Sequence, residues 1–245
     1  MTAPSDPAAD VAGRIAATRV RIALAAEAAG RSRADVLLIA ITKTHAPQVA
    51  QRAVDAGVTD LGENRVQELL AKRPHVNGAR WHLVGPLQRN KVRDVVGRQI
   101  LVHSVDRRPL IDTLSDRAER AGVVQRILVQ VNVGDDPAKG GCHLDETEDL
   151  VAYARRRPNL AVEGLMTMPP LPPDGVDPVD AARPLFAALR RQRDELRERF
   201  PEVVHLSMGM TNDLEAAVAE GATMVRLGTA LFGERGAGPW RKDDG

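Results

Sequence analysis

Short runs of aliphatic residues alternate along this chain with segments whose apolar residues recur at helical spacing. The clearest run, residues 36–42, is bounded by polar residues, which predicts a strand buried on both faces. Further strands, some of them short and less apolar, are predicted over residues 60–63, 80–85, 100–105, 125–133, 161–168, 203–207 and 223–228. Helical spacing, often ended by glycine, predicts helices over residues 10–29, 47–56, 64–72, 88–96, 109–121, 144–157, 179–200 and 212–220.

This regular alternation of strands and helices predicts an α/β fold with a parallel sheet. Eight strands in 245 residues match the size of a (β/α)8 TIM-type barrel, which is about 250 residues. We therefore predict a single barrel domain over residues 1–245, with an extra N-terminal helix and with residues 1–9 as a flexible leader. A doubly wound open sheet is the alternative.

In barrels of this kind the chemistry lies at the C-terminal ends of the strands. The proline-rich residues 169–178 follow the sixth predicted strand, so we interpret them as a loop on this active face and not as a domain boundary. The side chains that end each strand are therefore the candidates for function.

Lys43 comes directly after the first predicted strand. Because side chains alternate across a strand, Lys43 shares a face with Ile41 and Ile39, and if that face lines a barrel, Lys43 lies at its mouth. Partial removal from water favours the neutral form of an amine, which can then condense with a carbonyl group. The simpler interpretation is a lysine that ends a strand and extends into water.

The loops after the seventh and eighth strands have the composition of a phosphate-binding site. Gly209 and Gly228 permit a close approach of the backbone, and Ser207, Thr211 and Thr229 can each donate a hydroxyl hydrogen bond. In this fold, phosphate groups are often bound by these two loops.

Arg226 alternates with apolar neighbours in the eighth strand, which predicts that it points into the barrel. A buried guanidinium can only donate hydrogen bonds, so it needs an acceptor. That acceptor is either a carboxylate, such as Asp213 or Glu63, or a neutral heteroaromatic nitrogen. Pyridoxal phosphate fits this combination. It has a carbonyl group for the lysine, a phosphate for the two loops and a ring nitrogen for the arginine.

Composition argues against several classes of partner. The sequence has 34 Lys and Arg against 33 Asp and Glu, with 2% aromatic residues, a balance that favours neither nucleic acid nor an anionic membrane. Cys142 is the only cysteine, which excludes a disulfide framework and fits a reducing compartment. We see no signal peptide and no apolar run near the roughly 20 residues of a membrane span, so we expect a soluble, cytoplasmic protein.

The remaining polar residues of note have plain interpretations. His82, His103 and His205 lack metal-ligand spacing, so we predict no metal site and expect hydrogen-bonded strand histidines. Lys72 and Lys242 are interpreted as surface residues.

A series of motifs gives the chain a specific resemblance, running from the first strand to the eighth. The chain resembles the pyridoxal phosphate homeostasis proteins, long labelled proline synthetase co-transcribed homologues, whose barrel is similar to the N-terminal domain of alanine racemase. The motifs are residues 42–44, 62–68, 81–91, 103–106, 164–168, 206–210 and 225–233.

The resemblance implies pyridoxal 5'-phosphate as the cofactor and a role in vitamin B6 homeostasis. We assign no catalytic residue and no metal ligand. The residues implied to hold the cofactor are Lys43 as the Schiff-base lysine, Arg226 at the pyridine nitrogen, Ser207, Gly228 and Thr229 at the phosphate, and Asn64 elsewhere in the pocket.

The chain departs from the family pattern at a few positions. Thr211 stands where many relatives have serine, which keeps the hydroxyl, and Asp136 replaces a common glutamate in the loop that leads to Lys139. His45 stands where a second lysine is frequent, which argues against transfer of the cofactor between lysines there. Lys91 and Lys139 have two possible interpretations, as solvent-facing loop lysines or as residues of a phosphate or second site.

Two functions remain open at this point. One is a binding protein that holds pyridoxal phosphate and hands it to apo forms of pyridoxal phosphate enzymes. The other is an amino-acid racemase or decarboxylase. A third interpretation is a phosphate-binding barrel in which Lys43 forms a Schiff base of the aldolase type. The racemase relatives take a tyrosine base from a C-terminal domain, whereas the only tyrosine here, Tyr153, falls on a predicted outer helix. We therefore favour a monomeric binding protein without appreciable racemase activity.

Overall fold

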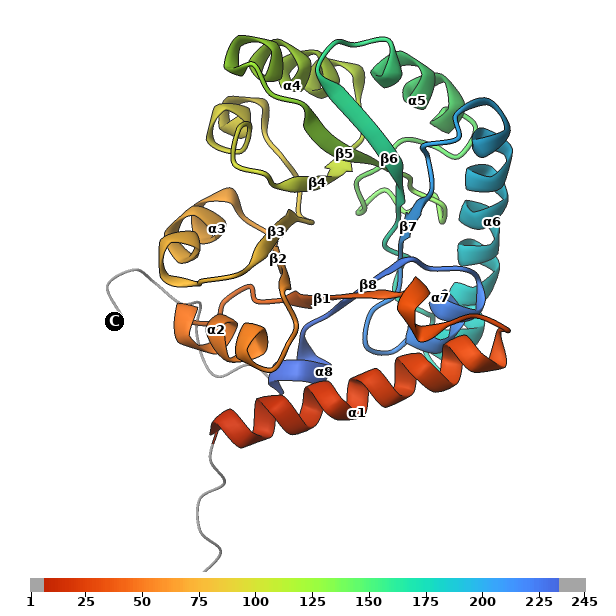
Figure 1. The fold of residues 1–245 in the computed structure, drawn as a ribbon. Helices are drawn as coiled ribbons and strands as arrows, with labels where there is room; N and C mark the ends of the chain where they lie inside the picture. Colours follow the sequence, from red (N-terminus) through yellow and green to blue (C-terminus); the bar gives the residue numbers. More distant parts are fainter. Residues whose placement is uncertain (1–6, 234–245) are drawn as a thin grey trace, which may run out of the picture.

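Eight parallel strands close into a barrel in which each strand pairs with its neighbours in the sequence and the last pairs with the first (Figure 1). The computed structural model describes residues 7–233. The predicted (β/α)8 fold is confirmed. The strands are β1 Leu37–Ile41, β2 Asp60–Glu63, β3 Arg80–Leu83, β4 Leu101–Val105, β5 Gln125–Gln130, β6 Leu160–Met166, β7 His205–Ser207 and β8 Met224–Leu227.

Helices surround the barrel, and several begin or end where the local sequence favours it. Prolines lie at the start of α2 and α6, where a missing N–H costs no helical hydrogen bond. Gly122 ends α4 in a left-handed conformation, with φ of 63°. The helices are α1 Pro7–Ala28, α2 Pro47–Asp55, α3 Val66–Lys72, α4 Arg108–Ala121, α5 Thr147–Arg155, α6 Pro178–Arg199, α7 Leu214–Ala219 and α8 Thr229–Phe232, with 3-10 segments η1 Arg33–Asp35, η2 Arg73–His75 and η3 Arg89–Asp94.

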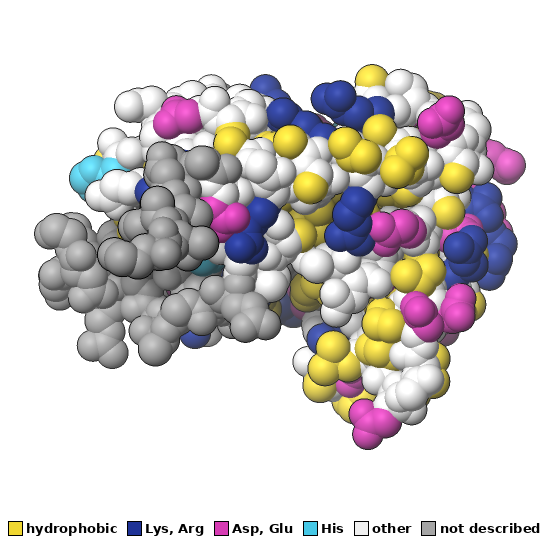
Figure 2. Space-filling model, turned by 90° about the horizontal axis from the view of Figure 1, so that it is seen from below, with side chains coloured by type: hydrophobic (Ala, Val, Ile, Leu, Met, Phe, Trp, Pro, Cys, Tyr) yellow, Lys and Arg dark blue, Asp and Glu magenta, His cyan; other side chains and the backbone are white. Residues whose placement is uncertain are grey.

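The additional helix α1 packs across α7 and α8, beside the seam where β1 meets β8 (Figure 1). It begins at Pro7, inside the segment expected to be a leader, and the rest of that segment lies outside the described residues. Figure 2 views the molecule from the side on which α1 lies, where hydrophobic side chains are interspersed with charged ones. Val20 and Leu24 of α1 are among the exposed ones.

The core has two parts, separated by the sheet itself. The larger part lies between the strands and the helices. The smaller part fills the barrel and contains Ile39 and Ile41, so the predicted alternation along β1 is correct. The buried members of the inner cluster are Ile39, Ile41, Val84, Leu101, Leu128, Met166 and Met224.

Three predicted elements differ from the structure. Residues 89–94, within the helix predicted over 88–96, form a 3-10 helix whose buried side includes Val92. The fifth strand ends at residue 130 and α5 begins at residue 147. The loop between them is tied back to the sheet by a bridge between Val131, which falls in the predicted strand, and Cys142, which falls in neither predicted element.

Lys72 corrects the interpretation of the sequence. It was expected at the surface, but its exposed fraction is 0%, and its Nζ lies 2.6 Å from a carboxylate oxygen of Glu63. The cause is that α3 ends against the sheet, so the last residue of the helix turns inward and finds a buried carboxylate. Lys242 lies outside the described residues.

Among the residues that the structure describes, no helix is long and apolar enough to span a membrane.

Candidate functional site

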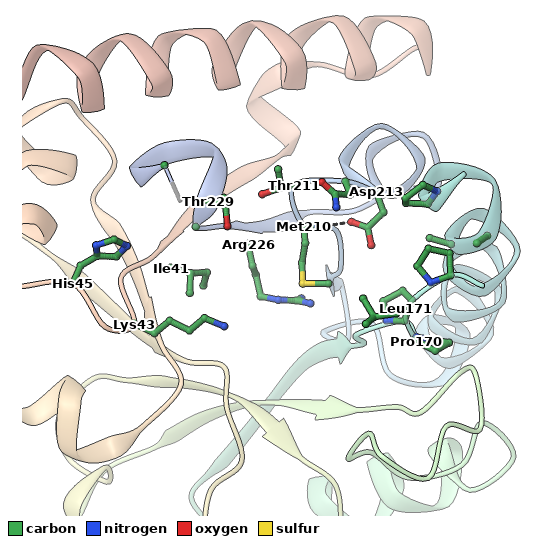
Figure 3. Close-up of a pocket in the computed structure, with 18 residues that line it drawn as sticks. Ile41, Lys43, His45, Pro170, Leu171, Met210, Thr211, Asp213, Arg226 and Thr229 are labelled. Atoms are coloured by element: carbon green, nitrogen blue, oxygen red, sulfur yellow. Dashed lines mark hydrogen bonds between the residues drawn. The ribbon is translucent and has the colours of Figure 1, made fainter. Parts of the chain in front are cut away.

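A cavity of about 530 Å³ opens at the C-terminal ends of β1 and β8 (Figure 3). Its far wall is formed by Pro169, Pro170 and Leu171, which confirms that the proline-rich segment belongs to the active face. Figure 3 shows the side chains of Lys43 and Arg226 extending into the same space. The sequence prediction that these two residues meet at the mouth of a barrel is therefore correct.

Lys43 lies just beyond β1, in a tight turn. The backbone N–H of His45 donates to the carbonyl oxygen of Thr42, at 3.1 Å, and closes the turn around Lys43. The Lys43 side chain is half-buried, and His45 also lines the cavity, with its ring packed against Phe232. The amine of Lys43 is thus presented from a short loop fixed at both ends.

Arg226 projects from β8 into the barrel and is only 4% exposed. It donates to the hydroxyl of Ser207 and to the carbonyl oxygen of Thr167, each at 2.7 Å. These acceptors are a hydroxyl and a backbone carbonyl, and neither is a carboxylate, which was one of the two acceptors that the sequence left open. Burial lowers the pKa of Arg226 to about 10, and the negative charge of Asp213 opposes that shift.

Asp213 is the carboxylate whose charge acts on Arg226, and it also lines the cavity. It accepts a hydrogen bond from the backbone N–H of Met210 at 2.5 Å. Burial raises the pKa of Asp213, although the Met210 bond and the charge of Arg226 act the other way. The other carboxylate considered for Arg226, Glu63, is bound to Lys72 instead.

Below Arg226, a chain of hydrogen bonds runs through the interior of the barrel. Ser207 Oγ lies 2.9 Å from His103 Nδ1, His103 Nε2 lies 2.9 Å from His82 Nδ1, and His82 Nε2 lies 3.0 Å from Asp60. All five side chains are buried. The expectation that these histidines are satisfied strand residues is confirmed.

The direction of this chain follows from its ends. Arg226 can only donate, so Ser207 accepts from it and points its own proton at His103. Burial lowers the pKa of His103 well below its usual value, so His103 is neutral and carries its one proton on Nε2, toward His82. His82 then donates from Nε2 to Asp60, and every bond has one donor and one acceptor.

The chain ends at the opposite face of the barrel. Asp60 and His82 border a second cavity, of about 620 Å³, at the N-terminal ends of the strands. There Arg80 donates two hydrogen bonds to Asp60, and His205 contacts the hydroxyl of Thr223 at 3.3 Å. Within the described part of the chain, no group of His, Cys, Asp and Glu could hold a metal ion.

The structure brings together some of the predicted residues and separates others. Lys43, Arg226, Gly228 and Thr229 line the cavity. Ser207 is fully buried beneath Arg226 and is not part of the lining.

Asn64 also lies away from the lining. It follows β2, where its backbone carbonyl packs against Gly85 so closely that an added Cβ would lie 2.1 Å from the oxygen. Met210 and Asn212 line the cavity and were missed as site residues. Their position directly after the seventh strand was the available signal, but neither has a side chain that marks it for chemistry.

Comparison with known proteins places the whole chain in one family. Residues 16–236 match the family model described as alanine racemase, N-terminal domain. A pyridoxal phosphate homeostasis protein of Aquifex aeolicus is 42% identical over 225 residues, which cover 91% of this chain and 97% of that protein. The protein of the same name in Escherichia coli (strain K12) is 37% identical over 231 residues, or 92% of this chain and 97% of that one.

The solved structures agree with this result. PipY of Synechococcus elongatus, solved with pyridoxal phosphate bound, matches with a TM-score of 0.77 and 32% identity, over 91% of this chain and 99% of PipY. With its closed eight-stranded barrel and this degree of identity to its relatives, the chain belongs to the family of pyridoxal phosphate homeostasis proteins, within the alanine racemase N-terminal domain family.

Proposed function

We propose that this protein binds pyridoxal phosphate in the cavity at the ends of β1 and β8, holds it covalently on Lys43, and serves vitamin B6 homeostasis without appreciable racemase activity. The observation that carries the proposal is the convergence of Lys43 and Arg226 on one cavity. The names of the relatives and the ligand bound to PipY support it.

The residues of the cavity fit this cofactor. Its volume of about 530 Å³ lies within the usual range of small-molecule sites, roughly 300–1,000 Å³. Arg226 offers a donor to a ring nitrogen, and Thr211 and Thr229 offer hydroxyls to a phosphate. Gly228 lets the backbone after β8 pass close to β1, because an added Cβ would lie 3.3 Å from the carbonyl oxygen of Ile41.

When bound, pyridoxal phosphate would supply an aldehyde, with which the amine of Lys43 would condense with loss of one molecule of water. The protein orients this reaction by holding Lys43 in a closed turn and Arg226 on two fixed acceptors. A guanidinium gives up a proton far less readily than a carboxylic acid does, so Arg226 would leave the ring nitrogen unprotonated. That weakens the cofactor as an electron sink, but racemases resemble this arrangement, so the feature that separates storage from turnover is a second proton carrier.

The position of the only tyrosine also supports a holding role. Tyr153 lies on α5, where its hydroxyl donates to Asp112, and it does not line the cavity. Thr211, Asn212 and Asp213 face the cavity opposite Lys43. Of these, only Asp213 could carry a proton, and it already accepts a hydrogen bond from Met210 N–H and lies in the field of Arg226.

Borohydride reduction of protein incubated with pyridoxal phosphate, followed by peptide mass mapping, tests the proposal. The adduct is expected on Lys43 and is expected to be absent from Lys43→Met. Lys91 and Lys139 lie outside the cavity lining and serve as internal controls. An adduct found mainly on either of them would contradict the assignment of Lys43.

The same proposal extends to partners and location. We propose that the recipients are apo forms of pyridoxal phosphate enzymes, that the protein acts as a monomer, and that it works in the cytoplasm, where the buried, free thiol of Cys142 is compatible with a reducing compartment. Reactivation of an added apoenzyme by the loaded protein, followed with and without a membrane that separates the two, checks direct transfer. Transfer that persists across the membrane would show release into solution instead.

A further inference from the structure

A buried cluster of three ionisable side chains lies directly behind Lys43. Lys72, the last residue of α3, places its Nζ 2.6 Å from Glu63 Oε1 and 3.5 Å from Glu68 Oε2. The exposed fractions of the Lys72 and Glu63 side chains are both 0%. No role in the cavity described above requires these charges, because none of the three residues lines it.

The cluster holds the chain on both sides of Lys43. Before Lys43, the carbonyl oxygen of Thr42 accepts a hydrogen bond from Lys72 Nζ at 2.6 Å, and the Thr42 hydroxyl donates to Glu63 Oε1 at 2.6 Å. After Lys43, the backbone N–H of Thr44 donates to Glu68 Oε2 at 2.9 Å. The two residues that flank the reactive lysine are thus each bound to a member of the cluster.

The backbone at Thr44 shows what these bonds maintain. Thr44 has φ of 68°, a left-handed conformation that is a genuine outlier for a β-branched residue. Such strain persists only where the surroundings impose it, and it concentrates at functional sites. Here the bond to Glu68 and the closure of the turn by His45 impose it.

Stability alone does not account for the cluster. A buried ion pair is often no better for stability than apolar residues of similar volume. Burial raises the pKa of Glu63 in spite of the nearby Lys72 charge, and Glu63 Oε2 has no hydrogen-bond partner within the described residues. Burying these charges costs free energy, and each of them contacts a defined backbone or side-chain atom. The cluster is therefore better explained by a role in holding the local backbone conformation.

We propose that Lys72, Glu63 and Glu68 are positioning residues for Lys43, which lock the turn over residues 42–45 so that the lysine amine projects into the cavity. This inference rests on the proposed role of Lys43 as the residue that bonds to pyridoxal phosphate. The cluster acts on that reaction through the backbone of Thr42 and Thr44, without touching the cofactor.

A matched pair of substitutions at Glu68 tests the inference. Glu68→Leu removes the acceptor of the Thr44 N–H, whereas Glu68→Gln keeps an oxygen in the same place. In the cofactor-free protein, amide hydrogen exchange at Thr44 should accelerate strongly in Glu68→Leu and should stay close to wild type in Glu68→Gln. Adduct formation on Lys43, trapped with borohydride at timed intervals, should slow by roughly tenfold to a hundredfold in Glu68→Leu and recover most of its rate in Glu68→Gln.

The buried pair is tested by the joint substitution Lys72→Met with Glu63→Gln, which avoids leaving one charge unpaired. The same slowing of adduct formation is expected. Glu163→Leu is the control. Like Glu68→Leu it removes one carboxylate, but Glu163 pairs with Arg126 at the surface and not with the turn around Lys43. It should lower stability without changing the rate at Lys43.

The outcomes separate this inference from the proposed function. If wild-type protein forms no adduct on Lys43, the proposed function fails, and the exchange of Thr44 still reports whether Glu68 locks the turn. If wild type forms the adduct but Glu68→Leu and the double variant change the rate no more than Glu163→Leu does, the positioning role is overturned. Unchanged exchange at Thr44 in Glu68→Leu would also overturn it.

Discussion

At the scale of single residues, the hydroxyls of Ser207, at the end of β7, and Thr229, at the start of α8, lie in different surroundings. Thr229 is exposed at the cavity, where it can meet a phosphate. Ser207 is fully buried and is already committed to Arg226 and His103. The sequence motif treats them alike, but the structure shows that only one of them is accessible to a ligand.

We therefore expect different losses from their removal. Thr229→Val keeps the shape of the side chain and should weaken binding of pyridoxal phosphate by roughly 1–3 kcal/mol, the range for a hydrogen bond to a charged group, with little effect on unphosphorylated pyridoxal. Ser207→Ala frees Arg226 and should weaken both ligands together. Titration calorimetry with both ligands checks this. Equal losses in Thr229→Val would remove the phosphate role from that hydroxyl.

At the scale of elements, five strands each contribute one member to the hydrogen-bonded chain inside the barrel. β2, β3, β4, β7 and β8 supply Asp60, His82, His103, Ser207 and Arg226. Because each bond joins different strands, the chain fixes how far one strand is shifted against the next. The orientation of Arg226 at one end therefore depends on Asp60 at the other.

This dependence predicts a pH effect. Burial alone would raise the pKa of Asp60, but the bonds from His82 and Arg80 outweigh it and lower the pKa from 3.8 to about 2. A carboxyl group whose pKa is lower in the folded than in the unfolded state stabilises the fold at pH values above the unfolded-state pKa. That stabilisation is lost as the pH falls toward the folded-state pKa. Asp60→Asn should therefore cost on the order of 2 kcal/mol of unfolding free energy at neutral pH, with the difference from wild type shrinking between about pH 4 and pH 2.

Urea unfolding of both proteins over that pH range measures the effect. Asp112→Asn is a suitable control, because Asp112 is a half-exposed carboxylate on α4, outside the barrel interior. A difference between Asp60→Asn and wild type that stayed constant down to pH 2 would show that Asp60 carries no linked proton.

The elements also show how far the sequence could lead. Apolar runs marked strands such as β1 and β5, because a strand covered on both faces needs such residues along its length, whereas β2 and β7 were found from their place in the alternation with helices. The strand-end rule then placed Lys43 and Arg226 at one mouth. It could not identify the partners of His82 and His103, since these depend on the register of a closed sheet. It also could not show that Lys72 is buried, because helical spacing does not reveal where the end of a short helix meets the sheet.

At the scale of the whole molecule, Lys43 and Arg226 reach into one cavity, whereas Tyr153 does not line it. General acid–base groups typically contribute about 10²–10⁴-fold each, so a site without a tyrosine base opposite Lys43 should support at most slow proton exchange. We expect loaded protein, incubated in deuterium oxide with single enantiomers of several amino acids, to show neither loss of chirality nor rapid exchange of the α-proton. Turnover at ordinary enzymatic rates, abolished by Lys43→Met, would instead show that the protein is an enzyme.

The pairing of β1 with β8 has a consequence for when the site forms during synthesis of the chain. Ile39 lies opposite Arg226 across this seam, so the cavity is assembled from the first and the last strand of the barrel. During synthesis Lys43 leaves the ribosome well before β8, which supplies Arg226 and completes its surroundings. A nascent chain therefore carries the lysine without the site. Capture of the cofactor can begin only after the final strand has been released and has closed the ring.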